Sequence, residues 1–240
     1  MRTILVIDDE RPTLRMFELF LGAYGYTVLT AASGEDGLAV FAEQRPPIVL
    51  TDIKMPGMDG LAVLRAIKED SPETEVVVIT GHGDVDLALT ALGLRATDFI
   101  DKPIRREALE AALARANARL EHAAAGANGD AIAVEHDGDV AVIAIAGSLT
   151  AASEPYLTRA VRQADEARKL LFAFSPDASI NGAGLDLVAQ AAEDSQGGGR
   201  PVALCGLSDN FAMVLDRLGI TGRAPRFAGR REALAYLSSR

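Results

Sequence analysis

Residues 48–60 read IVLTDIKMPGMDG, which places Asp52 directly after a short apolar run. The run Ile48–Leu50 predicts a buried strand, and the segment Lys54–Gly60 predicts a turn. Comparable apolar runs recur between residues 3 and 120, at Ile4–Ile7, Val28–Leu29, Val76–Ile79 and Phe99–Ile100. The first part of the chain therefore predicts five short strands, each apolar throughout.

The segments between these runs have helical spacing. Leu14, Phe17 and Leu21 follow an i, i+3, i+7 pattern, and Leu61, Leu64 and Ile67 repeat every third residue. Continuous apolar strands that alternate with amphipathic helices predict a parallel sheet covered on both faces. We therefore expect a doubly wound α/β domain with the strand order 2-1-3-4-5. Pro12 suits a first helical turn, and Ser33–Asp36 resembles a capping box.

Composition excludes several classes of protein. The chain has 240 residues, 49% of them apolar, and a formal charge of −10 at pH 7. So acidic a surface repels phosphate backbones, and we expect no nucleic-acid ligand. Cys205 is the single cysteine and there are three histidines, so neither an internal disulfide nor a Cys/His zinc site is expected. No apolar run approaches a membrane span, and the N-terminus has no cleavage-type segment, which favours a cytoplasmic protein without membrane contact.

A change of pattern near residue 122 predicts two domains. We expect a first domain at 1–121, a linker at 122–130 rich in small residues, and a mixed-sheet α/β domain at 131–240. The second domain opens with a hairpin signal at Asp137-Gly138. Leu109, Leu113, Ala116 and Leu120 have coiled-coil spacing; we favour a last helix packed on its own sheet, with an extension toward a second copy, and hence a homodimer, as the alternative.

Three carboxylates end neighbouring strands of the predicted sheet. Asp8 and Asp9 follow the first strand, and Asp52 follows the third. Ligands of such sheets bind at the carboxyl ends of the strands where the strand order reverses. Converging carboxylates need a cation, and hard oxygen ligands suit Mg²⁺. Each aspartate alone has a simpler interpretation, as a helix cap or a turn residue.

Thr80 and Lys102 end the next two strands at the same edge. A hydroxyl, an ammonium group and a metal around one carboxylate can bind a phosphoryl group attached to that carboxylate. Asp52 is the natural nucleophile because it lies between the others. Singly, Thr80 is an ordinary strand end and Lys102 a solvated lysine.

With these motifs in order, residues 1–120 resemble the receiver domain of bacterial two-component response regulators. The matching stretches are VIDDE at 6–10, VLTDIKMPGMDG at 49–60, VVVITGHGD at 76–84 and DFIDKP at 98–103. The resemblance implies phosphoryl transfer from a sensor histidine kinase to Asp52, with Mg²⁺ held by Asp9, Asp52 and the main chain of Lys54, and by Asp8 through water. It also implies that Thr80 and Lys102 contact the phosphoryl group and that Phe99 is the aromatic switch residue.

Further positions bear on the rate of acyl-phosphate hydrolysis and on the surface through which the first domain would signal. Lys54 lies two residues after Asp52, and His82 two after Thr80; in receivers these positions border the acyl phosphate, so we expect both to tune its hydrolysis. The stretch Gly93–Thr97 departs from the usual approach to the last strand and leaves the output geometry open.

Residues 130–240 resemble a STAS domain, the fold of anti-sigma-factor antagonists. The family usually has Asp-Ser-Ser/Thr-Gly-Leu before its second helix, and a partner kinase phosphorylates the first serine. Here that motif reads Asn181-Gly182-Ala183-Gly184-Leu185, and Thr150 replaces a second usual aspartate. The phosphosite is therefore degenerate; Ser179 is a displaced acceptor or, as we favour, a solvent-facing loop serine. A helix-turn-helix at Asp209–Gly219 is the less favoured interpretation.

Together these features predict a response regulator and not an enzyme with an external substrate. Phosphorylation of Asp52 would control the binding of the second domain to an anti-sigma factor or a serine-kinase-like partner. The alternatives are a phosphate sink or dimerising scaffold without a dedicated partner, and a Mg²⁺-dependent phosphohydrolase. Against the phosphohydrolase, Lys54 replaces the acid that such enzymes carry two residues after the nucleophile.

Overall fold

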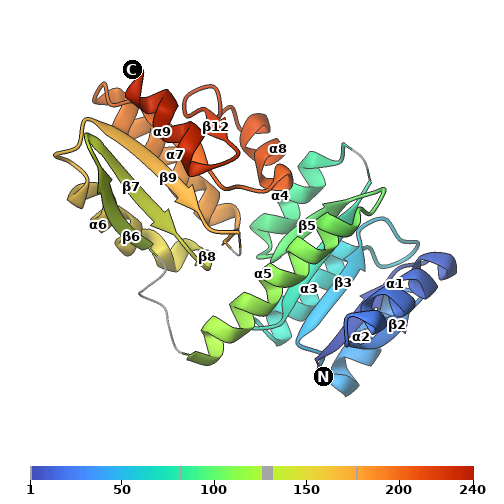
Figure 1. Cartoon of the computed structure of the whole chain (residues 1–240). Helices are drawn as coiled ribbons and strands as arrows, with labels where there is room; N and C mark the ends of the chain where they lie inside the picture. The colour runs from blue at the N-terminus through green and yellow to red at the C-terminus, as the bar shows by residue number, and fades with distance from the viewer. Residues whose placement is uncertain (1, 82, 126–131, 177) are drawn as a thin grey trace. The chain divides into compact units, whose positions relative to one another are not determined.

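The computed structural model describes residues 2–81, 83–125, 132–176 and 178–240 (Figure 1). The chain divides into two compact units, Met1–Leu120 and Glu121–Arg240. Each unit has its own sheet and its own core.

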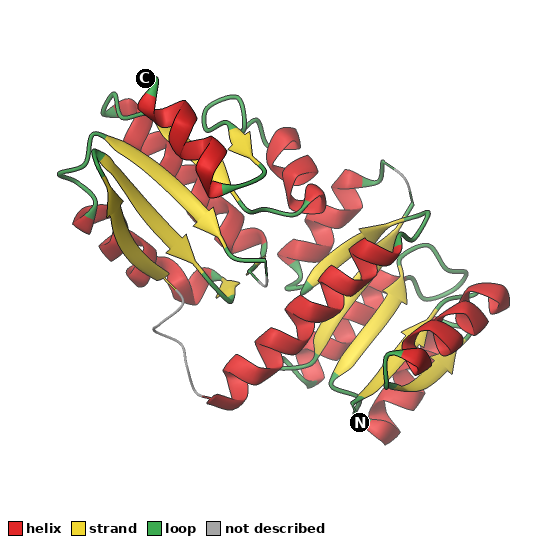
Figure 2. Ribbon diagram, in the orientation of Figure 1, coloured by secondary structure: helices red, strands yellow, loops and turns green. Residues whose placement is uncertain are grey.

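The first unit is built on a parallel five-stranded sheet in the order β2-β1-β3-β4-β5, which confirms the predicted order. Its strands are β1 (Thr3–Ile7), β2 (Thr27–Ala31), β3 (Ile48–Asp52), β4 (Glu75–Thr80) and β5 (Asp98–Asp101). Its helices are α1 (Arg11–Ala23), α2 (Gly34–Gln44), α3 (Gly60–Asp70), α4 (Val85–Gly93) and α5 (Arg106–Ala125). Helices lie on both faces of the sheet, so the doubly wound fold is also confirmed (Figure 2).

Helices α1 and α5 share one apolar core with the sheet. Phe17 of α1 and Leu109 and Leu113 of α5 are buried in a cluster with strand residues such as Val6 and Ile79. Full burial of one such side chain stabilises the fold by about 1.5–3 kcal/mol. The heptad-like residues of α5 therefore face their own sheet, as favoured. The helix continues to Ala125, into the range predicted as linker, and residues 126–130 of that range lie outside the described part of the chain.

Local signals set the start of two helices as the sequence predicts. The hydroxyl oxygen of Ser33 accepts a hydrogen bond from the backbone N–H of Asp36 at 3.1 Å, and so caps α2. Pro12 lies in the first turn of α1. At the start of α3, a Cβ on Gly60 would lie 2.0 Å from the carbonyl oxygen of Asp52. Only glycine lets α3 begin so close to the end of β3.

The second unit contains a mixed five-stranded sheet in the order β12-β11-β9-β7-β6. β6 pairs antiparallel with β7 through the predicted hairpin, and the other pairs are parallel. The sheet strands are β6 (Ile132–Asp137), β7 (Val140–Ile145), β9 (Lys169–Phe174), β11 (Val202–Cys205) and β12 (Arg226–Phe227). The helices are η1 (Ala151–Ser153), α6 (Glu154–Gln163), α7 (Gly182–Gly197), α8 (Asp209–Arg217) and α9 (Arg230–Ser238).

Two very short strands, β8 (Ser148–Leu149) and β10 (Ser179–Ile180), form a separate parallel pair that the sequence does not predict. This pair leads into α7. A Cβ on Gly184, in the first turn of α7, would lie 2.3 Å from the carbonyl oxygen of Leu149. The start of α7 is thereby held against β8 in the same way as α3 is held against β3.

The core under α9 joins this helix to the sheet. Ala233 and Leu237 pack with Val142, Leu171 and Ala203. After α8 the chain turns into β12, so no second helix completes a helix-turn-helix there. Within the described residues, no helix combines the length and apolar character needed to cross a membrane.

Candidate functional site

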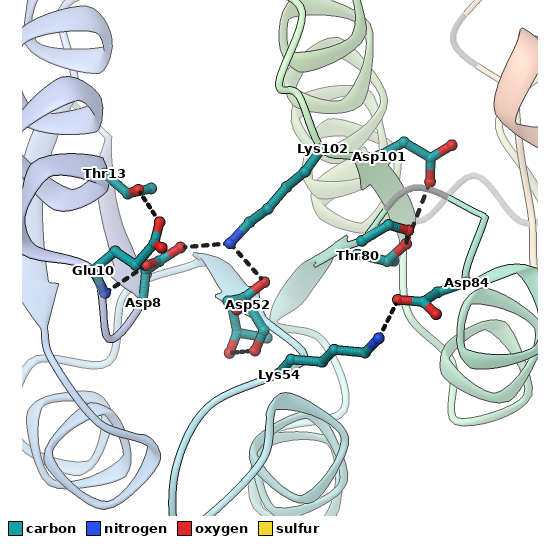
Figure 3. Close-up of polar contacts among 11 residues, drawn as sticks. Asp8, Glu10, Thr13, Asp52, Lys54, Thr80, Asp84, Asp101 and Lys102 are labelled. Carbon is teal, nitrogen blue, oxygen red and sulfur yellow. Dashed lines mark hydrogen bonds and ion pairs between the residues drawn. The ribbon is translucent and has the colours of Figure 1, made fainter.

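Asp8 and Asp52 meet at the carboxyl ends of the neighbouring strands β1 and β3 (Figure 3). Asp8 is fully buried and Asp52 is 4% exposed. The ammonium nitrogen of Lys102, which follows β5, lies 3.2 Å from Asp52 Oδ1 and 3.4 Å from Asp8 Oδ2. The structure therefore brings Asp8, Asp52 and Lys102 together, and the Lys102 ammonium group bridges the two carboxylates.

Burial dominates the electrostatics of this group. It raises the pKa of Asp52, an effect that Lys102 opposes and that the charges of Asp8 and Asp9 increase. Burial likewise raises the pKa of Asp8, against a hydrogen bond from the backbone N–H of Glu10 at 2.8 Å. Partial burial lowers the pKa of Lys102, but Asp52 and Asp8 outweigh it and leave that pKa above its usual value. The site thus favours added positive charge.

Asp9 is exposed beside the pair of buried carboxylates. The negative charge of Asp9 raises the pKa of Asp52. Among the described residues, no three acidic, histidine or cysteine side chains form a compact metal-binding group. The oxygen donors of Asp8, Asp52 and Asp9 nevertheless fit a hard divalent cation by their chemistry. In this structure Lys102 provides the neutralising charge between the first two.

Thr80 ends β4 and is 1% exposed. Its hydroxyl oxygen has two acceptors within hydrogen-bonding distance, Asp101 Oδ1 at 3.3 Å and the carbonyl oxygen of Gly81 at 3.1 Å, and its one O–H can donate to either. Asp101 is a partner that sequence reasoning missed, although it directly precedes Lys102. Phe99, on the neighbouring β5, is 1% exposed and lies in the interior.

Lys54 lies at the edge of the site, and its side chain is exposed. Its ammonium nitrogen lies 2.7 Å from Asp84 Oδ2, at the position before α4. The sequence analysis did not identify Asp84 as a partner of Lys54. The feature that could have indicated it is its position at the start of a helix, shortly after Thr80. His82, the other position expected to tune rate, lies outside the described residues.

The degenerate motif of the second unit forms the start of α7. Asn181 Oδ1 accepts a hydrogen bond from the backbone N–H of Gly184 at 2.9 Å, so Asn181 is the N-cap, and Gly182 and Ala183 open the first turn. The N–H of Asn181 bonds to the carbonyl of Leu149, which brings the neighbouring Thr150 to the same end of α7.

Ser179 is a correction to the sequence interpretation. It is 1% exposed within β10, so it is not a solvent-facing loop serine. Its burial follows from the unpredicted pairing of β10 with β8. A kinase has no access to a hydroxyl buried in this way.

The fold and the acidic crevice of the first unit define a class of protein. A doubly wound sheet with buried carboxylates at its switch point and a lysine between them is the arrangement expected of a receiver domain. Residues 4–114 match the family model of the response regulator receiver domain, and residues 131–233 match that of the STAS domain. The two family models thus find a receiver domain and a STAS domain in the same chain.

Individual relatives match about half of this chain. The probable transcriptional regulator ycf27 of Porphyridium aerugineum is 36% identical over 125 residues, or 52% of this chain and 52% of that protein. The C4-dicarboxylate transport transcriptional regulatory protein DctD of Rhizobium meliloti is 38% identical over 114 residues, or 48% and 25%. The chain spans about half or less of the length of these curated relatives. A solved response regulator receiver domain protein from Clostridium thermocellum is 36% identical and covers 52% of this chain and 98% of that one, with a TM-score of 0.48.

Proposed function

We propose that Asp52 accepts a phosphoryl group from a sensor histidine kinase and that this modification controls the second domain. The observation that carries the proposal is the position of Asp52, buried at a strand end with Lys102 Nζ 3.2 Å away. The carboxylate attacks phosphorus, and the bond from phosphorus to the kinase histidine breaks. Lys102 offers its charge to the phosphoryl oxygens, and the Thr80 hydroxyl is exchanged from Asp101 to the phosphoryl group.

Mg²⁺ fits the oxygen donors of this site, because hard divalent cations prefer carboxylate oxygens. Asp8, Asp9 and Asp52, with the main chain of Lys54, would hold the ion. When bound, it offsets the negative charge that develops on the phosphoryl oxygens. Burial makes unpaired carboxylates at Asp8 and Asp52 costly, and the single positive charge of Lys102 offsets one of their two negative charges.

This activity is that of a phosphoacceptor, not of an enzyme that turns over an external substrate. Labelling by a small phosphodonor such as acetyl phosphate tests it directly. With Mg²⁺, wild-type protein and Asp70→Asn, which changes an exposed carboxylate at the far end of α3, should label equally. Asp52→Asn should not label. Retained labelling of Asp52→Asn would sink the assignment, and steady turnover of a phosphoester would revive the phosphohydrolase alternative.

For the output we propose a protein partner of the anti-sigma factor or serine-kinase-like class, which binds at the start of α7. Support comes from the capped and well-formed N-terminus of this helix, kept although Gly182 and Ala183 lack a hydroxyl group. Since a kinase cannot switch this end of α7 through those residues, control falls to Asp52. A cytoplasmic, bacterial setting accords with this pairing.

Affinity capture with the full chain as bait tests the output. It should be run with Mg²⁺, with and without beryllofluoride as a stand-in for the phosphoryl group. We expect a partner whose recovery changes with beryllofluoride and is lost in Gly182→Glu, because a charge at the start of α7 disrupts an interface there. Recovery of the bait alone in both states would favour the phosphate sink or dimerising scaffold.

A further inference from the structure

Thr80 and Asp101 are the last residues of the neighbouring strands β4 and β5, and they are partners in the register of the sheet. Paired residues of adjacent strands present their side chains on the same face. The hydroxyl oxygen of Thr80 accordingly lies 3.3 Å from Asp101 Oδ1 (Figure 3). Thr80 is 1% exposed, whereas Asp101 is half-buried. A buried hydroxyl group and a partly exposed carboxylate therefore face each other at the edge of the sheet that holds Asp52.

The Thr80 hydroxyl has one proton and two acceptors within reach. The carbonyl oxygen of Gly81 lies at 3.1 Å and the Asp101 carboxylate at 3.3 Å. A hydrogen bond to a charged oxygen is roughly twice as strong as one to a neutral oxygen, which favours Asp101 although it is the more distant acceptor. Within the described residues, no hydrogen bond joins the Thr80 hydroxyl to Asp52. The hydrogen bond that Thr80 could offer to a phosphoryl group on Asp52 is thus directed elsewhere.

The Asp101 carboxylate takes no part in the cluster of Asp8, Asp52 and Lys102. Although Lys102 is the next residue along the chain, its ammonium group lies between Asp8 and Asp52. In the part of the chain that the structure describes, the hydroxyl of Thr80 is the one polar partner of the Asp101 side chain. An effect of Asp101 on Asp52 therefore passes through Thr80 or through the charge of the carboxylate.

Phe99 lies two residues before Asp101 and hence on the same face of β5. Phe99 is 1% exposed, so its ring already lies in the interior while the Thr80 hydroxyl is within reach of Asp101. Burial of this ring therefore does not require a phosphoryl group. The group that remains to be moved is the Thr80 hydroxyl, and Asp101 competes for its proton.

We propose that Asp101 is a positioning residue that holds the Thr80 hydroxyl away from Asp52 and thereby weakens the binding of a phosphoryl group there. The inference rests on the proposed phosphorylation of Asp52 and adds a residue that regulates it. When a phosphoryl group is present, the Thr80 hydroxyl exchanges its hydrogen bond to Asp101 for one to a phosphoryl oxygen, and water solvates the partly exposed carboxylate. No covalent bond changes at Thr80 or Asp101. The gain from the new hydrogen bond is reduced by the one that is lost.

Binding of beryllofluoride in the presence of Mg²⁺, followed by fluorine NMR of the full chain, tests the inference. Beryllofluoride stands in for the phosphoryl group on Asp52. We expect Asp101→Ala to bind it about three- to tenfold more tightly than the wild type, because the competing acceptor is gone. Asp101→Asn keeps a neutral acceptor and should fall between the two. Asp70→Asn, at the far end of α3, should bind as the wild type does.

A double-mutant cycle with Thr80→Val separates this role from a general effect of charge or folding. Thr80→Val removes the hydroxyl group and keeps the volume of a side chain that is 1% exposed. In the Thr80→Val background, Asp101→Ala should leave the affinity unchanged, because the two residues act through one hydrogen bond. Tightening of the same size with and without the hydroxyl group would show that Asp101 acts by its charge alone, and would overturn the proposal.

The two Asp101 variants also test the role without any change at Thr80, so the test survives if Thr80→Val fails to fold. Both variants remove the negative charge, but only Asp101→Asn keeps an acceptor; equal affinities of the two would therefore overturn the proposal. Wild-type affinity in Asp101→Ala would overturn it as well, by showing that the Gly81 carbonyl holds the hydroxyl. By contrast, no bound beryllofluoride in the wild type, or equal binding by Asp52→Asn, would contradict the phosphorylation of Asp52 itself and the inference with it.

Discussion

The ammonium group of Lys54 and the carboxylate of Asp84 lie 2.7 Å apart and link the turn after β3 to the start of α4. The side chain of Lys54 is 63% exposed and that of Asp84 is 26% exposed. Exposed pairs of this kind contribute about 0–1 kcal/mol to stability. The pair lies against Gly81, where an added Cβ would be 2.7 Å from Asp84 Oδ2. We therefore expect the Lys54–Asp84 ion pair to affect the surroundings of Asp52 more than it affects the stability of the fold.

Breaking this pair should speed loss of the phosphoryl group from Asp52. In Lys54→Met the side chain no longer ties the β3 turn to α4, and water reaches the acyl phosphate more readily. We expect hydrolysis to rise by about three- to tenfold, a barrier change of roughly 1 kcal/mol. The decay of ³²P-labelled protein measures the rate. Asp84→Asn breaks the same pair from the other side; an unchanged rate there would show that Lys54 acts without it.

Lys102→Met should destabilise the first unit when no metal is present. The change leaves Asp8 and Asp52 buried beside each other without the shared cation. Because the lysine side chain is 31% exposed, we expect a loss of about 1–2 kcal/mol, below the cost of breaking a fully buried pair. Urea unfolding in EDTA at pH 7 measures this loss. Added Mg²⁺ should stabilise Lys102→Met more than the wild type, and equal gains would contradict a shared cation site.

The pair Asp98–Arg115 is a buried contact between β5 and α5. Arg115 Nε donates to Asp98 Oδ2 at 2.7 Å, and the two side chains are 3% and 0% exposed. Asp98→Ala leaves a buried guanidinium without this partner and should cost about 3–5 kcal/mol. In Asp98→Ala/Arg115→Met the loss should be smaller than the sum of the single losses. Denaturant unfolding of the full chain tests both; a single-variant loss under about 1 kcal/mol would refute the account.

Lys68 predicts a pH dependence of stability. The residue is 2% exposed, its ammonium group donates to the carbonyls of Pro72 and Thr74, and burial lowers its pKa to about 8 against the opposing charge of Glu75. The unfolded chain keeps the ordinary value of 10.5, so between pH 8 and 10.5 it binds more protons than the folded chain does. Stability due to this group therefore rises with pH across that window, by roughly 3 kcal/mol.

Comparison with Lys68→Met isolates that effect, because other groups titrate alike in both proteins. The free energy of unfolding of the wild type, minus that of the variant, should increase from pH 8 to pH 10.5. If this difference in unfolding free energy does not change with pH, the pKa of Lys68 is not lowered in the folded chain and the prediction is wrong.

The first unit follows closely from its sequence because parallel strands are buried on both faces. Runs such as Ile4–Ile7 and Val76–Ile79 are therefore apolar without interruption and can be found by inspection. The strands β8 and β10 have two residues each, which is too few for any pattern. Their absence from the prediction is also why Ser179 was expected at the surface.

The sequence predicts only some of the side chains that meet around Asp52. Asp8, Asp52 and Lys102 end strands, and the order of a doubly wound sheet brings strand ends together. The partners Asp84 and Asp101 depend on how far particular side chains reach across neighbouring elements, which spacing does not encode.

The close approach of Gly60 to Asp52, matched by that of Gly184 to Leu149, has a consequence for mutational tolerance. In a survey of random substitutions, both glycines should score as intolerant as Asp52, although neither carries a reactive group. Their variants would lose folded protein, whereas Asp52→Asn would remain folded and fail only in phosphorylation. A map of tolerance combined with protein abundance would thus separate positions that protect backbone clearance from the position that carries the signal.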